Sequence, residues 1–206
     1  MRVRLLLDDN DTAGLDPTLA ALVSPYFVPG RRGTKTLVRV ASSGVKVKIL
    51  TNALESTDVA AVHSGYARRR RDLLKAGIEL YELRRDAREG PPSQRRTATD
   101  RRKPIAVDAE RIFIGSLNFD PRSAVHNTEL GLVIDSPSMA GALSRMFLKN
   151  IPDASYQVQF GPYRKLQWLE RRADGTTLTH HNEPGASLGR RLAVTVLGVL
   201  PIEGLL

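Results

Sequence analysis

The sequence predicts an α/β protein, because apolar segments with strand and helix periods alternate along most of its 206 residues. Its hydrophobic fraction of 41% and charged fraction of 26% are typical of an ordinary globular domain. The longest apolar run, residues 192–200, is about half of the ~20 residues that a membrane-spanning helix requires. No secretory signal is recognisable at the start, so neither a signal peptide nor a transmembrane helix is expected.

The first part of the chain is expected to alternate strand, helix, strand, helix, strand. Asp16 and Pro17 are suited to begin a short helix, and apolar side chains in the second helix fall on one stripe that ends before Gly77. Glycine there is suited to a left-handed cap at the end of the helix. The expected elements are a strand at residues 3–8, a helix at 16–22, a strand at 45–50, a helix at 58–76 and a strand at 78–83.

Residues 84–103 interrupt this order with an arginine-rich stretch that has no regular period and is expected to be an exposed loop. A hairpin, a strand and a helix are expected after it, followed by a small antiparallel tail. The final segment, residues 187–206, is amphipathic, and is predicted either to dock on the domain or to lie in a membrane interface. The expected elements are strands at 105–107, 111–115 and 128–135, a helix at 138–150, and strands at 156–160, 165–169 and 176–179.

The chain is strongly basic and contains no cysteine. Its net charge is +9 and its isoelectric point is near 10.2, which favours polyanionic partners such as an anionic membrane surface or nucleic acid. Arginine enrichment from a GC-rich genome would explain the same composition equally well. The lack of cysteine excludes disulfides and cysteine-based metal sites or nucleophiles.

A faint internal repeat appears when the chain is laid on itself with an offset of 42 residues. Asn10 then meets Asn52, and Asp16 meets Asp58. The second copy continues through a strand to the motif described next, whereas the first copy stops near residue 23. We therefore expect residues 1–23 to be a remnant of a first half, residues 24–150 a second half, and residues 151–206 a C-terminal tail.

The residues that carry chemistry lie in one motif. Lys103 is followed after four residues by Asp108, and Asp108 after six residues by Gly115, Ser116 and then Asn118. This spacing resembles the HKD motif of the phospholipase D superfamily, in which a histidine stands two residues before the lysine. The surrounding sequence segments, above all residues 113–123 and 127–131, resemble those of the bacterial cardiolipin synthase branch. The resemblance covers nearly the whole chain except residues 86–102.

The resemblance implies a fold, an activity and a set of site residues. The fold would be a phospholipase D-like mixed sheet flanked by helices, with one nearly complete half and a remnant of the other. The activity would be that of a phosphatidyltransferase or phosphodiesterase in which a histidine attacks phosphorus, without metal or other cofactor. Lys103 and Asn118 would bind phosphate with support from Ser116, and Glu129 would orient the histidine. Asp108 and Gly115 would be structural.

The histidine position is occupied by Arg101. Arginine stays protonated in proteins, so it cannot attack phosphorus or shuttle a proton, although it can bind phosphate. His126 is the one candidate for a substitute base, while His63 and the pair His180–His181 are expected to pack or to lie at the surface. The resemblance implies a second histidine, from the family's other half, which would follow the first copy of the repeat where that copy stops near residue 23. Both motif histidines are thus missing from this chain, which predicts a catalytically impaired pseudoenzyme. A deletion near residue 23 and a frame-shifted stretch at 90–102 would explain both losses.

The expected partners follow from the family and the charge. A phospholipid such as phosphatidylglycerol is the expected substrate, and the expected location is peripheral, on the cytoplasmic side of a bacterial membrane. Two alternatives stay open: a nuclease-like phosphodiesterase, in which a homodimer would pair two motifs, and a non-catalytic module that binds phosphate or anionic lipid. Nucleic acid is the less favoured partner.

Overall fold

The computed structural model describes residues 19–57, 59–85, 103–107, 111–115 and 131–199. They form one mixed sheet of nine strands in the order β6-β5-β4-β1-β2-β3-β7-β8-β9. The strands are β1 Leu19–Val23, β2 Lys46–Asn52, β3 Glu79–Leu83, β4 Lys103–Val107, β5 Arg111–Gly115, β6 Gly131–Asp135, β7 Ser155–Phe160, β8 Leu166–Arg171 and β9 Thr177–His180.

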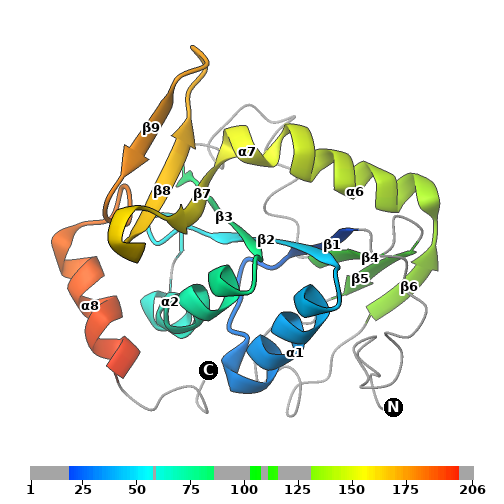
Figure 1. The fold of residues 1–206 in the computed structure, drawn as a ribbon, viewed down its shortest axis with the longest axis horizontal. Coiled ribbons are helices and arrows are strands. Elements are labelled where there is room, and N and C mark those ends of the chain that lie inside the picture. Colours follow the sequence, from blue (N-terminus) through cyan, green and yellow to red (C-terminus); the bar gives the residue numbers. More distant parts are fainter. Residues whose placement is uncertain (1–18, 58, 86–102, 108–110, 116–130, 200–206) are drawn as a thin grey trace.

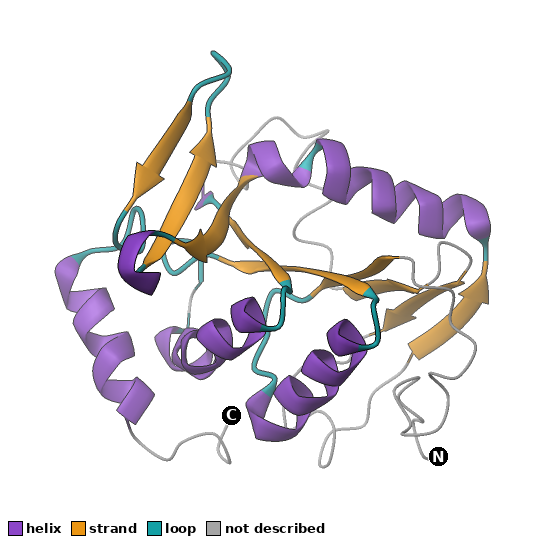
Figure 2. Cartoon of the chain, viewed as in Figure 1, coloured by secondary structure: helices purple, strands orange, loops and turns teal. Residues whose placement is uncertain are grey.

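Helices cover both faces of this sheet (Figures 1 and 2). Helices α1 and α2 lie on one face, α6 and α7 run along the other, and α8 lies beside α2. The sheet is therefore the middle layer of three, as an α/β sequence predicts. The helices are α1 Gly30–Ser42, α2 Ala60–Lys75, α6 Pro137–Lys149, α7 Ile151–Ala154 and α8 Leu188–Val199, with one 3₁₀ turn, η1 Pro162–Arg164.

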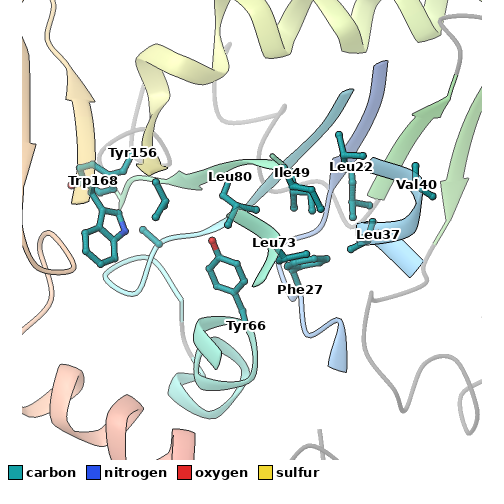
Figure 3. Close-up of a cluster of buried hydrophobic side chains, with 14 residues drawn as sticks. Leu22, Phe27, Leu37, Val40, Ile49, Tyr66, Leu73, Leu80, Tyr156 and Trp168 are labelled. Atoms are coloured by element: carbon teal, nitrogen blue, oxygen red, sulfur yellow. The ribbon is translucent and has the colours of Figure 1, made fainter. Parts of the chain in front are cut away.

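Strands β1, β2 and β3 are parallel and form the centre, with α1 and α2 as their crossovers. Alternate residues of a strand point to opposite faces. Leu22 and Ile49 accordingly join the core under α1 and α2 (Figure 3), while Ala21 and Leu50 join the core under α6 and α7. Burying one large apolar side chain contributes about 1.5–3 kcal/mol, so these two cores fix the layers.

Local signals explain the ends of the main helices. Gly77 has a φ of +80°, the left-handed conformation that ends α2 and that a side chain would strain. Helix α6 starts at Pro137, after Ser136, whose side chain accepts a hydrogen bond from the backbone N–H of Met139. Helix α6 buries Ala140, Leu143 and Phe147 on one stripe.

The last part of the chain extends the same sheet. Strand β7 pairs antiparallel with β3, and β8 and β9 follow in antiparallel order. Helix α8 is docked on α2, with Val194 buried in a small cluster that includes Leu54. Of the two alternatives for the final amphipathic segment, its described part therefore docks on the domain. Within the described residues, none of the helices has both the length and the apolarity needed to cross a bilayer.

Most elements expected from the sequence are confirmed, and one is wrong. The expected helix at residues 16–22 is wrong where the structure describes it, because Leu19–Val23 is strand β1. This apolar run pairs with β2 on one side and β4 on the other, and that pairing overrides the helical preference of its alanines. Helix α1 was not expected at all. The expected strand at residues 3–8 and most of the expected loop lie outside the described residues.

Candidate functional site

The motif residues that the structure describes lie at one edge of the sheet. Lys103, at the start of β4, pairs with Gly115 at the end of β5, and Gly115 pairs with Gly131 at the start of β6. Strand β4 runs antiparallel to β1, with Leu22 opposite Ile105. The start of β4 therefore lies where the parallel strands β1, β2 and β3 end. We call this row of strand ends the motif edge.

The carboxyl ends of parallel strands are where open α/β sheets bind their ligands. The chain leaves the motif edge at Gly115 and returns to it at Gly131, so the segment that carries Ser116, Asn118 and Glu129 begins and ends there. These three residues, together with Arg101, Asp108 and His126, lie outside the described residues. The backbone register alone brings Lys103 and Gly115 together.

Buried polar residues follow the parallel strands at the same edge. Ser24 follows β1 and is 1% exposed, and Asn52 ends β2 and is 4% exposed. Ser56, in the loop after β2, donates a hydrogen bond to the carbonyl of Leu83 at the end of β3. Sequence reasoning gave none of these residues a role, although a polar residue directly after a buried apolar strand is the signal that could have found them.

Tyr156 and Glu55 form the described side-chain pair at the β7 side of this edge. The Tyr156 hydroxyl donates to Glu55 Oε1 at 3.0 Å, and the backbone N–H of Arg85 donates to the same oxygen at 3.3 Å. Burial raises the pKa of Tyr156, and the negative charge of Glu55 raises it further. Tyr156 is therefore a neutral hydrogen-bond donor over the physiological pH range, and it ties β7 to the loop that follows β2.

Behind this edge, a buried ionic network joins α2 to the sheet and to the segment before α8. Arg70, which is 2% exposed, lies 3.0 Å from Glu82 and 2.9 Å from Glu183. Trp168 Nε1 donates to the second oxygen of Glu82 at 2.9 Å, and His63 Nε2 lies 3.2 Å from Glu183. A buried charge is tolerated when paired in this way.

The network accounts for one histidine, and a separate ion pair accounts for another. His63 is 3% exposed, so the expectation that it packs is confirmed. His180, in β9, is partly exposed and lies 2.7 Å from Glu170, and His181 is exposed. Burial alone would raise the pKa of Glu183, but the hydrogen bond from His63 and the charge of Arg70 outweigh it and lower the pKa to about 2. In the described structure these groups contact one another and join α2 to β3 and to the segment before α8.

Known proteins resemble this chain over most of its length. The family model described as "Cardiolipin synthase, PLD-like domain" matches residues 19–151. The chain belongs to this phospholipase D-like family. Cardiolipin synthase C of Escherichia coli (strain K12) is 39% identical over 191 residues, which are 90% of this chain and 40% of that relative. The chain thus spans less than half the length of this curated relative.

Two solved structures share the fold at low identity. Phosphatidylserine synthase from Haemophilus influenzae Rd KW20 superposes with a TM-score of 0.55 at 14% identity, covering 91% of this chain and 41% of that chain. The phospholipase D family member Nuc from Salmonella typhimurium superposes with a TM-score of 0.51 at 20% identity, covering 69% of this chain and 83% of that chain. The expected phospholipase D-like mixed sheet flanked by helices is confirmed.

Among the residues that the structure describes, no group of three or more histidine, aspartate or glutamate side chains is arranged to hold a metal ion.

Proposed function

We propose that this chain is a cardiolipin synthase-type phosphatidyltransferase domain that keeps the phosphate-binding edge of its family but has lost the nucleophile. The observation that carries the proposal is the pairing of Lys103 with Gly115 at the motif edge, with Arg101 two residues before the lysine. The lysine and the Gly-Ser pair of the motif are thus retained in the sequence, and the residue that would attack phosphorus is not a histidine.

The chemistry assigns a role to each motif residue. Transfer at a phosphodiester needs a nucleophile, an acid for the leaving alkoxide, and donors for the phosphoryl oxygens. Lys103, Asn118 and Ser116 supply donors. Glu129 would orient a histidine, but Arg101 keeps its proton and offers no lone pair for attack. Its guanidinium adds a further phosphate-binding group, because arginine pairs well with phosphate oxygens.

A phospholipid is the proposed ligand, with phosphatidylglycerol as the first to test. Family membership supports it, and the net charge of +9 favours an anionic membrane surface. In this role the chain binds the lipid phosphate without exchanging its alcohol. The proposed location is the cytoplasmic side of the membrane, without a membrane-crossing segment in the described residues.

The test is a transfer assay with phosphatidylglycerol vesicles, in which mass spectrometry measures cardiolipin and phosphatidic acid. The unaltered chain is expected to form neither product. Substantial turnover that disappears in Lys103→Ala but persists in Lys46→Ala, an exposed lysine at the start of β2 on the opposite edge, would overturn the loss of activity. Cleavage of single-stranded DNA with the same dependence on Lys103 would instead support the nuclease-like alternative.

Arg101→His is the sharpest variant, because it returns an imidazole to the position from which phosphorus is attacked. Because the N–P bond of a phosphohistidine is labile in acid, the protein is quenched under alkaline denaturing conditions, and it is expected to carry a phosphatidyl adduct in this variant and none in the unaltered chain. Failure of Arg101→His to form the adduct, with the variant folded, would show that losing this histidine alone is not what silences the site.

A further inference from the structure

A second candidate site lies away from the motif edge, on the face of the sheet that α2 covers. A cavity of about 550 Å³ opens between α2, α8 and the start of β8. It is lined by Arg68 and Arg71 from α2, Lys165 and Trp168 from the β8 region, and Arg191 and Thr195 from α8. Five strand positions separate β8 from β4, which is on the order of 24 Å at the usual strand spacing.

The cavity carries a positive charge that its own carboxylate does not offset. Among its described lining residues Glu183 is the one carboxylate, and it is already in contact with Arg70 and His63. Arg71 donates to the carbonyl of Arg164, a contact that leaves its charge unneutralised. The Nε of Arg191 is buried and has no hydrogen-bond partner among the described residues. An anion is the ligand that would match this lining.

An apolar stripe borders the cavity on the same helix. Leu188, Leu192 and Val196 are 81%, 65% and 53% exposed, respectively, and they are spaced four residues apart, which places them on one side of α8. At 100° per residue, Leu188 lies next to Thr195 around the helix, and Thr195 lies next to Arg191. The exposed apolar side and the cationic cavity are therefore neighbouring faces of one helix.

We propose that this corner binds an anionic phospholipid in a bilayer, with the phosphate group in the cavity and the apolar stripe of α8 among the acyl chains. A cationic pocket beside exposed leucines matches a ligand that is anionic at one end and apolar at the other. Nucleic acid would match the charge but would leave the leucines in water. The contact adds a point of membrane attachment to the proposed function, and it requires no turnover.

The experiment measures binding of the full chain to phosphatidylcholine vesicles with and without phosphatidylglycerol. Arg71→Ala/Lys165→Ala removes two exposed cations from the cavity, and Arg31→Ala/Lys35→Ala removes two exposed cations from α1 as a control of equal charge. Each cation at an anionic surface contributes about fivefold in affinity, so the double variant of the cavity is expected to bind the anionic vesicles roughly 25-fold more weakly. The α1 pair is expected to cost less than about threefold.

The apolar stripe is tested separately with Leu192→Ser. This change is expected to weaken vesicle binding about tenfold, and Leu148→Ser, a leucine of α6 that is 62% exposed, is expected to leave it unchanged. Circular dichroism and melting curves confirm that each variant is folded.

Three results would overturn the proposal. One is an equal loss from the cavity pair and the α1 pair, which would mean that net charge alone drives binding. Another is vesicle binding that is unaffected by Leu192→Ser. The third is a cavity-pair effect on single-stranded DNA binding without one on vesicles. The transfer assay and the Arg101→His adduct test the motif edge, whereas vesicle binding by the cavity pair and by Leu192→Ser tests this corner, so a failure of the transferase proposal and a failure of this one can be told apart.

Discussion

The two ends of the sheet are built in different ways. At the β4–β6 end, strands of five residues pair in register beside a motif that can be recognised in the sequence. The ion pair described there, between Arg111 and Asp135, is exposed and spans 3.9 Å. At the β7–β9 end, Arg70 and Glu82 are fully buried and paired at 3.0 Å. A local sequence motif therefore marks one end, while contacts between distant residues stabilise the other end.

The largest expected effect comes from removing the centre of the buried network. Arg70→Ala leaves Glu82 and Glu183 buried without their partner, and it removes a cation stacked on Tyr66 and Trp168. We expect a loss of about 3–5 kcal/mol in the free energy of unfolding, measured by urea denaturation. Arg111→Ala at the other end is the matched control and should cost below about 0.5 kcal/mol. Similar losses of unfolding free energy in the two variants would contradict the claim that the two ends of the sheet are stabilised differently.

The next largest effect is a pH dependence of the unfolding free energy that comes from Glu183, in the network at the β7–β9 end. The pKa of Glu183 is about 2 in the folded chain against an ordinary value of 4.5, so its contribution to stability is complete above about pH 5. It is lost as the pH falls from there towards 2, and amounts to at most about 3 kcal/mol. Unfolding free energies measured from pH 6 to pH 3 should fall more steeply for the unaltered chain than for Glu183→Gln. Parallel curves would contradict this.

The smallest effect is expected at the β4–β6 end. Ser136→Ala removes the side chain that caps α6, whose hydrogen bond to the N–H of Met139 is long at 3.4 Å. We expect a loss of about 0.5–1 kcal/mol by thermal or urea unfolding. Asp135→Asn, one residue earlier and 88% exposed at its side chain, should change stability by less than about 0.5 kcal/mol. A larger loss from Asp135→Asn would mean that charges do hold this end.

The sequence predicted the elements with strong local signals. The stripe of α2, the glycine that ends it and the β4–β5 hairpin can all be recognised within a few residues. The cap of α6 at Ser136 was not predicted, because the expected helix began at residue 138. Helix α1 lacks such a signal at its start, because Pro29 stands at its N-cap without a side-chain hydrogen bond and its first turn contains Arg31 and Arg32. Its buried residues Thr34, Leu37 and Val40 do recur every three residues, so a helical period was present and was overlooked.

The candidate sites divide in the same way. The spacing from Lys103 to Gly115 is a local pattern, and the structure places both residues at the motif edge as paired ends of two strands. The roles of Arg101, Asn118, Ser116, Glu129 and Asp108 stay predictions. The network of Arg70, Glu82 and Glu183 joins residues up to 113 positions apart, and the cavity draws on three elements. No local pattern encodes contacts over such separations.

Strand β1 has a consequence for how the halves of the sheet are joined. Five registered residue pairs tie β1 to β2, but two tie it to β4, and those two are Ala21 with Ala106 and Leu22 with Ile105. The hairpin that carries Lys103 is therefore joined to the parallel strands by a short stretch of backbone pairing. Helix α6 contacts both β1 and this hairpin on one face of the sheet. Changes within these few residues would shift the backbone of the motif hairpin relative to the parallel strands without disturbing the network around Arg70.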